Sequence, residues 1–445
     1  MANKKSLITK NLCIPCLVFF ILHSCASTGF SRLDTTVGQS KYSASLALLE
    51  KNKSSLYSKR DSVLYYLDKG MLSHYAGLYE NSSQSLESGE RAIEAAFTKS
   101  ITQGVLSYLL NDNVLDYPGE DYEDIYINIF GALNYYHRGM IEDAMVEIRR
   151  MNNKLANLST RYAVLVSELQ KKAMDENLEN IPPNPNAPSN FSDSALARYL
   201  GMLFYRSLGM DDDARIDSEG LRVAFANAPA VYPYPPPSSL SGELKIPHGM
   251  ARLNVIAFSG LSPVKQSQDI RIPIPSIGIR WAKIALPYIK SRGSQISRIE
   301  LVFDHGERIN LELLEDIGAV ARETFKARQN VVYLKSVIRA MLKGIASSAL
   351  NIAAHETKNK EQEDILSIFS ILTQIYAEAS EQADLRISRY FPAKAHVAGI
   401  NLEPGTYSFT VNYYGRSAKP IAVERRNNIV VTENALNLVE TFCPK

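Results

Sequence analysis

Hydrophobic and polar positions repeat with a helical period through the first half of the chain, and three stretches share one pattern. In each stretch, two runs of apolar residues at helical spacing are separated by a glycine. The stretches cover residues 63–95, 124–155 and 194–226, with glycines at Gly77, Gly139 and Gly209. Because glycine accepts the left-handed backbone geometry of a tight turn, each stretch is predicted to form two helices joined by a glycine turn.

Small and aromatic residues recur at matching positions of these stretches. The small residues are Gly70, Ala132, Ala144, Gly201 and Ala214, and the aromatic residues are Tyr135 and Tyr205. Small side chains let two helices approach closely, and an aromatic ring fills the space beside the contact. The spacing resembles the tetratricopeptide repeat, which implies an all-α helical repeat domain over residues 46–228. A generic helical bundle with coincidental glycine turns is the alternative.

A proline-rich segment at residues 229–241 ends this region. It includes the run Pro235-Pro236-Pro237, and consecutive prolines remove backbone donors and fix φ, so the segment cannot be helical. We interpret it as a stiff linker between two domains. A proline-rich ligand for a recognition domain is the alternative.

Beyond residue 242 the pattern changes to short apolar runs and strict alternation. The expected strands cover residues 253–258, 270–274, 299–303, 309–313, 395–397, 405–413, 421–423, 429–431 and 436–442. Within them Tyr407, Phe409 and Val411 alternate with polar residues, as in a half-buried strand. Two or three helices are expected between residues 314 and 381. The second half is therefore predicted to be an α+β domain over residues 242–445, with antiparallel strands and a helical insertion.

One stretch of this insertion, residues 337–354, is apolar and rich in small residues. A buried helix is predicted there, and membrane insertion is the alternative. Arg339 and Lys343 favour the buried helix, because a charge at the centre of a bilayer costs about 2.5 to 3.5 kcal/mol on insertion scales.

The first 24 residues have the three parts of an export signal. Three lysines precede an apolar run at residues 12–22, which is too short to span a bilayer. The sequence Leu22-His23-Ser24-Cys25 follows and resembles the lipobox of bacterial lipoproteins. The resemblance implies cleavage between Ser24 and Cys25 and a lipid on Cys25. An ordinary signal peptide with an incidental cysteine, or an uncleaved anchor, is the alternative.

The residues after the expected cleavage site predict where the anchored protein resides. Residues 25–45 are expected to be a short tether, and the remainder a body held at the cell envelope. No Asp follows Cys25 directly, which favours an outer membrane over an inner one.

Composition restricts the partners of the mature chain. Removal of residues 1–24 takes three lysines and no acidic residue, so 46 basic residues remain against 47 acidic ones. A basic footprint for nucleic acid is therefore absent. Only Cys443 is left besides Cys25, so neither an intramolecular disulfide nor a cysteine-based metal site is expected.

Signatures of known chemistry are missing from the sequence. It has no HExxH, no GxSxG, no phosphate-binding glycine loop and no dinucleotide fingerprint. We therefore expect no enzyme, no cofactor and no metal. Two acidic clusters, residues 120–124 and 211–213, are predicted to open helices, where acids complement the helix dipole. A cation site or a partner surface stays open for the first cluster.

The segment at residues 385–392 holds the densest group of arginines and aromatic residues. Arg386, Arg389 and Tyr390 are candidate interaction residues, because Arg and Tyr are frequent hot spots and an arginine pair can clamp a carboxylate or phosphate. An amphipathic strand is the alternative for this segment.

The chain as a whole resembles a family of uncharacterised bacterial lipoproteins with tetratricopeptide-like repeats. The resemblance is carried by residues 75–80, 133–144 and 383–393. It implies the architecture described above and no particular activity.

Three functions compete on these grounds. The first is a lipid-anchored scaffold or adaptor whose repeat groove binds an envelope protein; a groove filled by the chain's own side chains would count against it. The second is a peptidoglycan- or glycan-binding protein that uses Tyr407, Tyr413 and Tyr414 of the C-terminal domain. The third is an enzyme, for which no nucleophile and base are visible.

Overall fold

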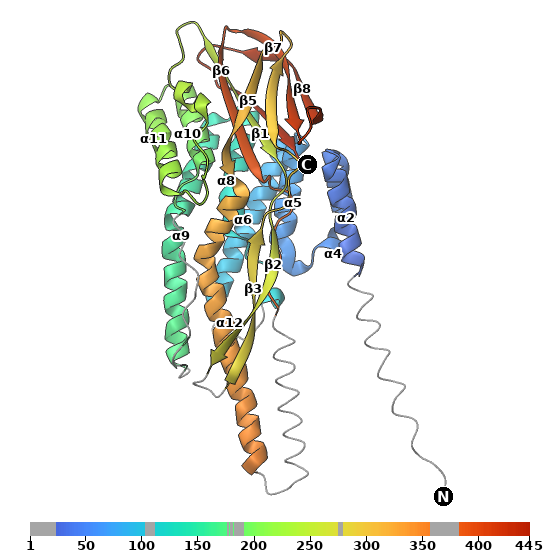
Figure 1. Ribbon diagram of the computed structural model, residues 1–445, viewed down its shortest axis with the longest axis vertical. Coiled ribbons are helices and arrows are strands. Elements are labelled where there is room, and N and C mark those ends of the chain that lie inside the picture. The colour runs from blue at the N-terminus through green and yellow to red at the C-terminus, as the bar shows by residue number, and fades with distance from the viewer. Residues whose placement is uncertain are drawn as a thin grey trace, which may run out of the picture.

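The computed structural model describes residues 24–102, 112–175, 178, 181, 191–274, 279–356 and 382–445. The protein is elongated, with helices of the first half packed along strands of the second half (Figure 1). Chain segments that are far apart in sequence therefore lie side by side along most of the long axis.

The described helices of the first half include three hairpins. Before them come α2 (Ser24–Gly38), α3 (Tyr42–Lys51) and α4 (Lys53–Leu56). The hairpins are α5 (Ser62–Tyr75) with α6 (Tyr79–Thr102), α8 (Asp121–His137) with α9 (Ile141–Asp175), and α10 (Ala195–Ser207) with α11 (Asp211–Asn227). Short 3₁₀ turns lie at Lys59–Asp61, Asp112–Val114 and Ser238–Gly242. Gly77, Gly139 and Gly209 occupy the turns with φ of 75°, 75° and 69°, which a Cβ would strain.

Small residues lie where the helices of a hairpin meet. A Cβ on Gly70 would lie 2.6 Å from Leu86 Cδ2. A Cβ on Gly201 would collide with the carboxylate of Asp217 in the same way. Three further small side chains are completely buried, those of Ala132, Ala144 and Ala214. Tyr135 and Tyr205 are half-buried and pack at the edge of the core.

The strands form one seven-stranded mixed sheet and a separate two-stranded hairpin. The seven strands are β1 (Ala251–Ser259), β4 (Arg298–Phe303), β5 (Arg308–Asp316), β6 (Lys394–Leu402), β7 (Gly405–Tyr414), β8 (Pro420–Val431) and β9 (Asn437–Cys443). Their order is β8-β7-β4-β5-β6-β1-β9, and β1 and β9 form the parallel pair. β2 (Val264–Ile274) and β3 (Ile279–Lys290) form the hairpin beside α12 (Ile317–Glu356).

The seven-stranded sheet curls until its two edge strands almost meet. Arg426 Nη2 on β8 donates to the carbonyl of Glu440 on β9 at 2.8 Å. The Phe442 amide on β9 donates to Glu424 Oε1 on β8 at 3.0 Å. Side chains therefore close the gap that backbone pairing leaves open, and the inside of the curl holds an apolar core that includes Leu253, Phe409 and Tyr413.

The predicted fold class, an all-α repeat domain followed by an antiparallel α+β domain, is wrong. The seven-stranded sheet is mixed, and the helices do not have a core of their own. Phe130 on α8 lies 5.3 Å from Phe258 on β1, and Tyr75 on α5 stacks on Phe442 of β9 at 3.8 Å between ring centroids. One hydrophobic cluster runs through both halves, because each layer buries its apolar face against the other.

Other details of the second half also differ from the sequence prediction, and one is that the strands expected at residues 421–423 and 429–431 form a single strand, β8. The strand β3 was not predicted, since its apolar and charged residues follow no clear alternation. The first two expected helices of the insertion are one continuous helix, α12. The third, expected near residues 361–381, lies outside the described residues.

The segments expected to be a tether and a linker are packed against the body. Residues 25–45 lie in α2 and the start of α3, with Leu33 and Val37 fully buried. In the proline-rich segment, Val231 and Tyr232 are buried, and the Tyr232 hydroxyl donates to Glu315 Oε2 at 2.6 Å. Apolar side chains thus hold both segments to the core.

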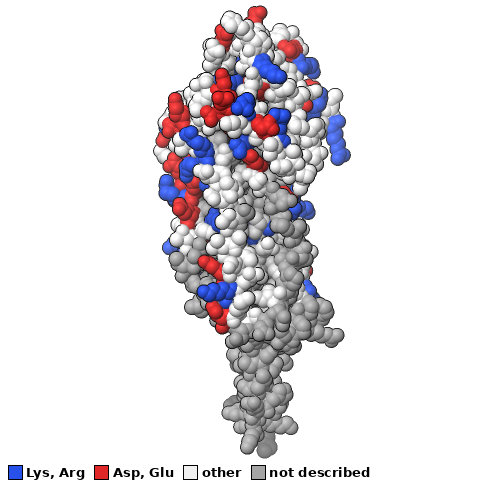
Figure 2. All heavy atoms as spheres, turned by 90° about the vertical axis from the view of Figure 1, so that its left-hand side faces the viewer, with Lys and Arg blue, Asp and Glu red and all other residues white. Residues whose placement is uncertain are grey.

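The face of the molecule that carries α9 and α11 has charges of both signs. On the face that carries α9 and α11, Lys and Arg are interspersed with Asp and Glu over the described residues (Figure 2). Among the helices that the structure describes, none combines the length and apolar character needed to cross a bilayer.

Candidate ligand pocket

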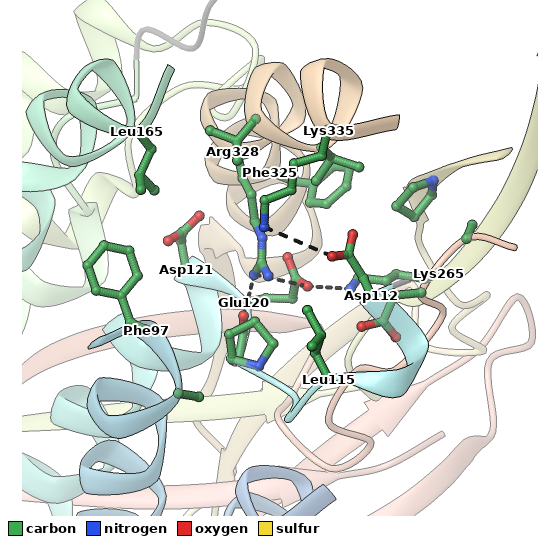
Figure 3. Close-up of a pocket in the computed structure, with 18 of the residues that line it drawn as sticks. Phe97, Asp112, Leu115, Glu120, Asp121, Leu165, Lys265, Phe325, Arg328 and Lys335 are labelled. Atoms are coloured by element: carbon green, nitrogen blue, oxygen red, sulfur yellow. Dashed lines mark hydrogen bonds and ion pairs between the residues drawn. The ribbon is translucent and has the colours of Figure 1, made fainter. Parts of the chain in front are cut away.

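The best-formed cavity lies where helices of the first half meet α12 and the β2–β3 hairpin (Figure 3). We call it the ligand pocket. Its volume is about 110 Å³. The described residues that line it and carry the argument are Phe97, Asp112, Leu115, Glu120, Asp121, Arg161, Tyr162, Leu165, Lys265, Phe325, Arg328 and Lys335. They come from α6, α8, α9, β2 and α12 and from the chain just before α8.

A buried carboxylate, Glu120, organises the floor of the pocket. It precedes α8 and forms a capping box with Glu123. Its side chain is almost completely buried and forms ion pairs with Lys265 of β2 and with Arg328 of α12, the latter at 3.3 Å. A carboxylate in this position is stable only with such partners. Burial alone would lower the pKa of Arg328, but Glu120 and its neighbours raise it above the usual value.

Two acids of α8, Asp121 and Glu123, have pKa values raised by burial. The Tyr162 hydroxyl bonds Asp121 at 2.8 Å, and burial raises the pKa of Asp121 to about 6. Burial and the nearby Glu120 raise the pKa of Glu123 to about 7. Glu123 accepts hydrogen bonds from the amides of Glu120 and Ser388 at 2.7 and 2.6 Å. The acidic cluster at residues 120–124 therefore caps α8, as predicted, and also joins it to the second half.

The walls of the pocket are apolar and include one stacked guanidinium. Phe97, Leu165 and Phe325 face the space from α6, α9 and α12 (Figure 3). The Arg161 guanidinium lies 3.4 Å from the centroid of the Phe97 ring. Its Nε is buried without a hydrogen-bond partner, and Arg161 forms no ion pair with any residue that the structure describes. At the other side, burial lowers the pKa of Lys335, and Asp112 at 4.0 Å opposes this effect.

The candidate interaction residues in segment 385–392 are used inside the protein. Arg386 binds the carboxylates of Asp384 and Asp61, at 2.8 and 3.2 Å, and also backbone carbonyls. Arg389 pairs with Asp34, and the Tyr390 hydroxyl donates to Asp34 at 2.9 Å. The arginine pair therefore does clamp carboxylates, but these belong to the same chain: to Asp384 just before the segment, to Asp61 before α5 and to Asp34 of α2. The segment itself is irregular rather than a strand.

The tyrosines expected to bind glycans lie mostly in the core of the curled sheet. Tyr413 is fully buried and donates to Thr441 at 2.7 Å, and Tyr414 is also buried. Tyr407 is half-buried against the same core. The alternation in β7 predicts a half-buried strand, and the structure agrees: Tyr407 and Tyr413 lie on the same face as Phe409, and that face points into the core.

A second group of titratable residues, which sequence reasoning did not find, joins α5 and α8 to β9. We call it the histidine cluster. Glu440 lies between His74 Nε2 at 2.7 Å and His137 Nε2 at 3.0 Å, and Asn134 contacts His74 Nδ1 at 2.7 Å. Burial alone would raise the pKa of Glu440, but the two histidines hold it well below its usual range. In turn, Glu440 and Asn134 raise the pKa of His74 against the effect of burial.

The remaining candidate residues can be placed only in part. Helix α2 begins at Ser24, so Ser24 and Cys25 lie in its first turn, while residues 1–23 of the expected signal lie outside the described residues. Cys443 is buried and unpaired at the end of β9. Within the described part of the chain, no group of three His, Cys, Asp or Glu residues is arranged to hold a metal ion.

Comparisons of the chain with known protein families, with curated proteins and with solved structures give no match.

Proposed function

We propose that this chain is a lipid-anchored cell-envelope protein that binds a small amphipathic molecule in the ligand pocket. The ligand class is a compact apolar group that carries one acidic group. The lipid anchor rests on the sequence around Cys25, and the ligand class rests on Arg161.

The pairing of charges around the pocket supports an acidic group on the ligand. Most acids on the wall already have a cation of this chain beside them: Asp112 has Lys335, Asp116 has Lys99, Glu120 has Lys265 and Arg328, Asp124 has Lys154, and Asp384 has Arg386. Asp121 instead accepts hydrogen bonds from Tyr162. Arg161 stacks on the Phe97 ring and forms no ion pair with a carboxylate among the described residues, although the charge of Asp121 lies close enough to interact with it. A guanidinium in this state favours a bidentate carboxylate, sulfonate or phosphate.

The apolar walls support the other half of the ligand. Phe97, Leu165 and Phe325 present ring and aliphatic surface to a space of about 110 Å³. Such a space suits a single ring or a short branched chain, because ligand pockets combine mostly apolar walls with a few placed polar groups.

Two observations count against the adaptor and glycan-binding functions expected from the sequence. The first helices of two hairpins, α5 and α8, would line the groove of a repeat domain, but β9 and residues 383–393 cover them. The Tyr75 hydroxyl on α5 donates to the Tyr390 carbonyl at 2.9 Å. The Tyr136 hydroxyl on α8 donates to the Leu438 carbonyl of β9 at 2.9 Å. The chain thus fills the groove on which an adaptor would rely. The tyrosine face proposed for glycans is likewise part of the core.

Titration of the full chain, purified in detergent, with two matched probes tests the ligand class. Phenylacetate has a ring and a carboxylate, and phenylacetamide has the same shape without the charge. By isothermal titration calorimetry, phenylacetate should bind about tenfold more tightly than the amide, a difference of about 1.4 kcal/mol. Arg161→Gln should remove this difference.

Arg215→Gln is the matched control, because Arg215 is exposed on α11 and away from the pocket. It should leave both affinities unchanged. Equal binding of the acid and the amide by the unaltered protein would contradict the proposed ligand class.

The anchor is tested separately by labelling cells with an alkyne analogue of palmitate. The protein should carry the label and fractionate with membranes, and Cys25→Ser should lose both properties. Cys443→Ser is the control and should keep them, since Cys443 is buried in the fold. Label that persists in Cys25→Ser would refute lipidation at this residue.

A further inference from the structure

A second cavity, which we call the anion cavity, lies at the N-terminal end of α12. Its volume is about 200 Å³. It is formed by the connection between β3 and β4, by the first residues of α12 and by the start of β6. The residues used below are Ser291, Arg292, Ser294, Asp316, Gly318 and Lys394. The space can hold several water molecules or one group of comparable size.

Arg292 is the residue that most requires an explanation. Its Nε and Nη2 atoms are buried, and it forms no hydrogen bond or ion pair with any residue in the described part of the chain. Burial and the neighbouring Arg389 lower the pKa of Arg292, and the charge of Asp34 only partly opposes them. A guanidinium taken out of water without a partner is strongly unfavourable, so the charge is incompletely balanced by the protein alone.

Lys394 adds a second cation to the same cavity. Lys394 and Asp316 lie opposite each other in the register of β6 and β5, which is a backbone pairing and not an ion pair of their side chains. The Lys394 ammonium group makes no ion pair within the described residues. Asp316 is the one acid among the described lining residues, and its Oδ1 already accepts the Ala319 amide at 2.8 Å, which caps the first turn of α12. The cavity therefore has two cations against one occupied carboxylate.

Hydroxyl groups complete the polar lining. The Ser291 hydroxyl accepts a hydrogen bond from Arg322. The Ser294 hydroxyl donates to the Lys445 carbonyl at 2.9 Å. The Ser294 proton is therefore already used. The donors left for a ligand are the Arg292 guanidinium, the Lys394 ammonium and the Ser291 hydroxyl, which are groups that recognise phosphate and carboxylate oxygens.

We infer that the anion cavity binds an oxyanion, namely the phosphate or carboxylate group of a small molecule, held by Arg292 and Lys394. This site is separate from the ligand pocket and shares no lining residue with it. It can therefore exist whether or not the proposed function is correct.

Thermal unfolding of the full chain in detergent tests the inference. Sodium phosphate should raise the Tm in a saturable manner, compared with sodium chloride at the same ionic strength and pH. Arg292→Gln should raise the Tm in chloride, because it removes a buried charge without a partner, and should abolish the shift caused by phosphate. Lys394→Gln should weaken the apparent phosphate affinity about tenfold. Lys51→Gln, on the exposed side of α3, is the control and should keep the full shift.

Sodium acetate in a parallel titration distinguishes the two oxyanion classes. A shift with phosphate alone assigns a phosphate group, and a shift with acetate alone assigns a carboxylate; both support the cavity as an oxyanion site. A Tm that rises no more with either salt than with chloride would overturn the inference. So would a phosphate shift that Arg292→Gln and Lys394→Gln leave unchanged, because the anion would then bind elsewhere.

Discussion

At the scale of single residues, buried charged groups link chain segments that are more than 300 residues apart. Glu440 connects to His74 and His137, and Arg389 connects to Asp34. Such contacts are favourable only while each charge has its partner, since an uncompensated buried charge costs about 3 to 5 kcal/mol. The contribution of His74 and Glu440 to stability must therefore depend on pH, because the fold shifts the pKa of both groups.

The histidine cluster should give the protein a stability that falls above neutral pH. The pKa of His74 is raised in the folded protein, so its contribution is complete below pH 6.5 and is lost as pH rises through the folded value. The contribution of Glu440, whose pKa is lowered, is present above about pH 4.5 and is lost at more acidic pH. His74→Gln should therefore lower the free energy of unfolding by about 3 kcal/mol at pH 6, and by less at pH 8.

Urea unfolding at the two pH values measures this difference. His305→Gln is the control, because His305 lies in an exposed turn and should change stability by less than about 0.5 kcal/mol at either pH. An equal loss for His74→Gln at both pH values would mean that its charge is not involved.

Asp121 should have the opposite pH dependence to an ordinary ion-paired acid. Its pKa is raised to about 6 by burial, so the folded protein binds a proton more readily than the unfolded chain between about pH 4 and 6. Stability therefore decreases as pH rises through this range. Asp121→Asn keeps an oxygen for Tyr162 and should stabilise the protein at pH 7.5 by up to about 3 kcal/mol, while the effect vanishes near pH 4.

The same urea titrations test this prediction, and Asp212→Asn is the control, because Asp212 is exposed at the start of α11. Part of the pH dependence should survive in Asp121→Asn, since Asp68 also has a pKa raised to about 6. If Asp121→Asn is less stable than the parent at pH 7.5, the prediction is contradicted. The attraction between the Asp121 carboxylate and Arg328 would then stabilise the fold by more than the burial of that carboxylate costs.

At the scale of elements, the helical hairpins depend on missing side-chain volume. Gly70→Val should destabilise the protein by about 1 to 3 kcal/mol, because a Cβ at this position overlaps Leu86 of the paired helix. Gly38→Ala is the control: no atom lies within 4 Å of a Cβ there, and the effect should be close to zero. Chemical denaturation measures both, and a neutral Gly70→Val would show that α5 and α6 can move apart freely.

Most of the elements, and few of their contacts, were predictable from sequence. The turns at Gly77, Gly139 and Gly209 were predictable, because a tight turn with positive φ favours glycine whatever the rest of the fold. Alternation placed Tyr407 and Phe409 on one face of β7 for the same local reason. Neither signal says which surface a helix or strand will contact, since periodicity records only that a face is buried.

The residues of the ligand pocket carry no comparable local signal. Arg161, Lys265 and Arg328 lie on α9, β2 and α12, and each resembles an ordinary surface cation in the sequence. Only the fold brings two of them to Glu120 and leaves the third stacked on Phe97. The acidic cluster at residues 120–124 was noticed, but its partners were not.

At the scale of the whole molecule, a core shared by helices and sheet predicts one cooperative unit. Hydrogen exchange measured by mass spectrometry should give α8 and β1 the same free energy of opening, because Phe130 and Phe258 belong to one cluster. The hairpin β2–β3, outside the seven-stranded sheet, is the internal comparison and should open at lower free energy. A helical half that opens well before β1 would indicate two separate domains after all.

The sequence by itself determined the features that depend on neighbouring residues: the glycine turns, the helices on either side of them, most strands and the break at the prolines. The tertiary structure alone decided the mixed sheet, the shared core, the internal ion pairs of Arg386, the burial of Tyr390 and both cavities. Those features depend on contacts between segments as distant as Tyr75 and Phe442. Local propensity and periodicity do not encode such contacts, because many pairings of buried faces satisfy the same pattern.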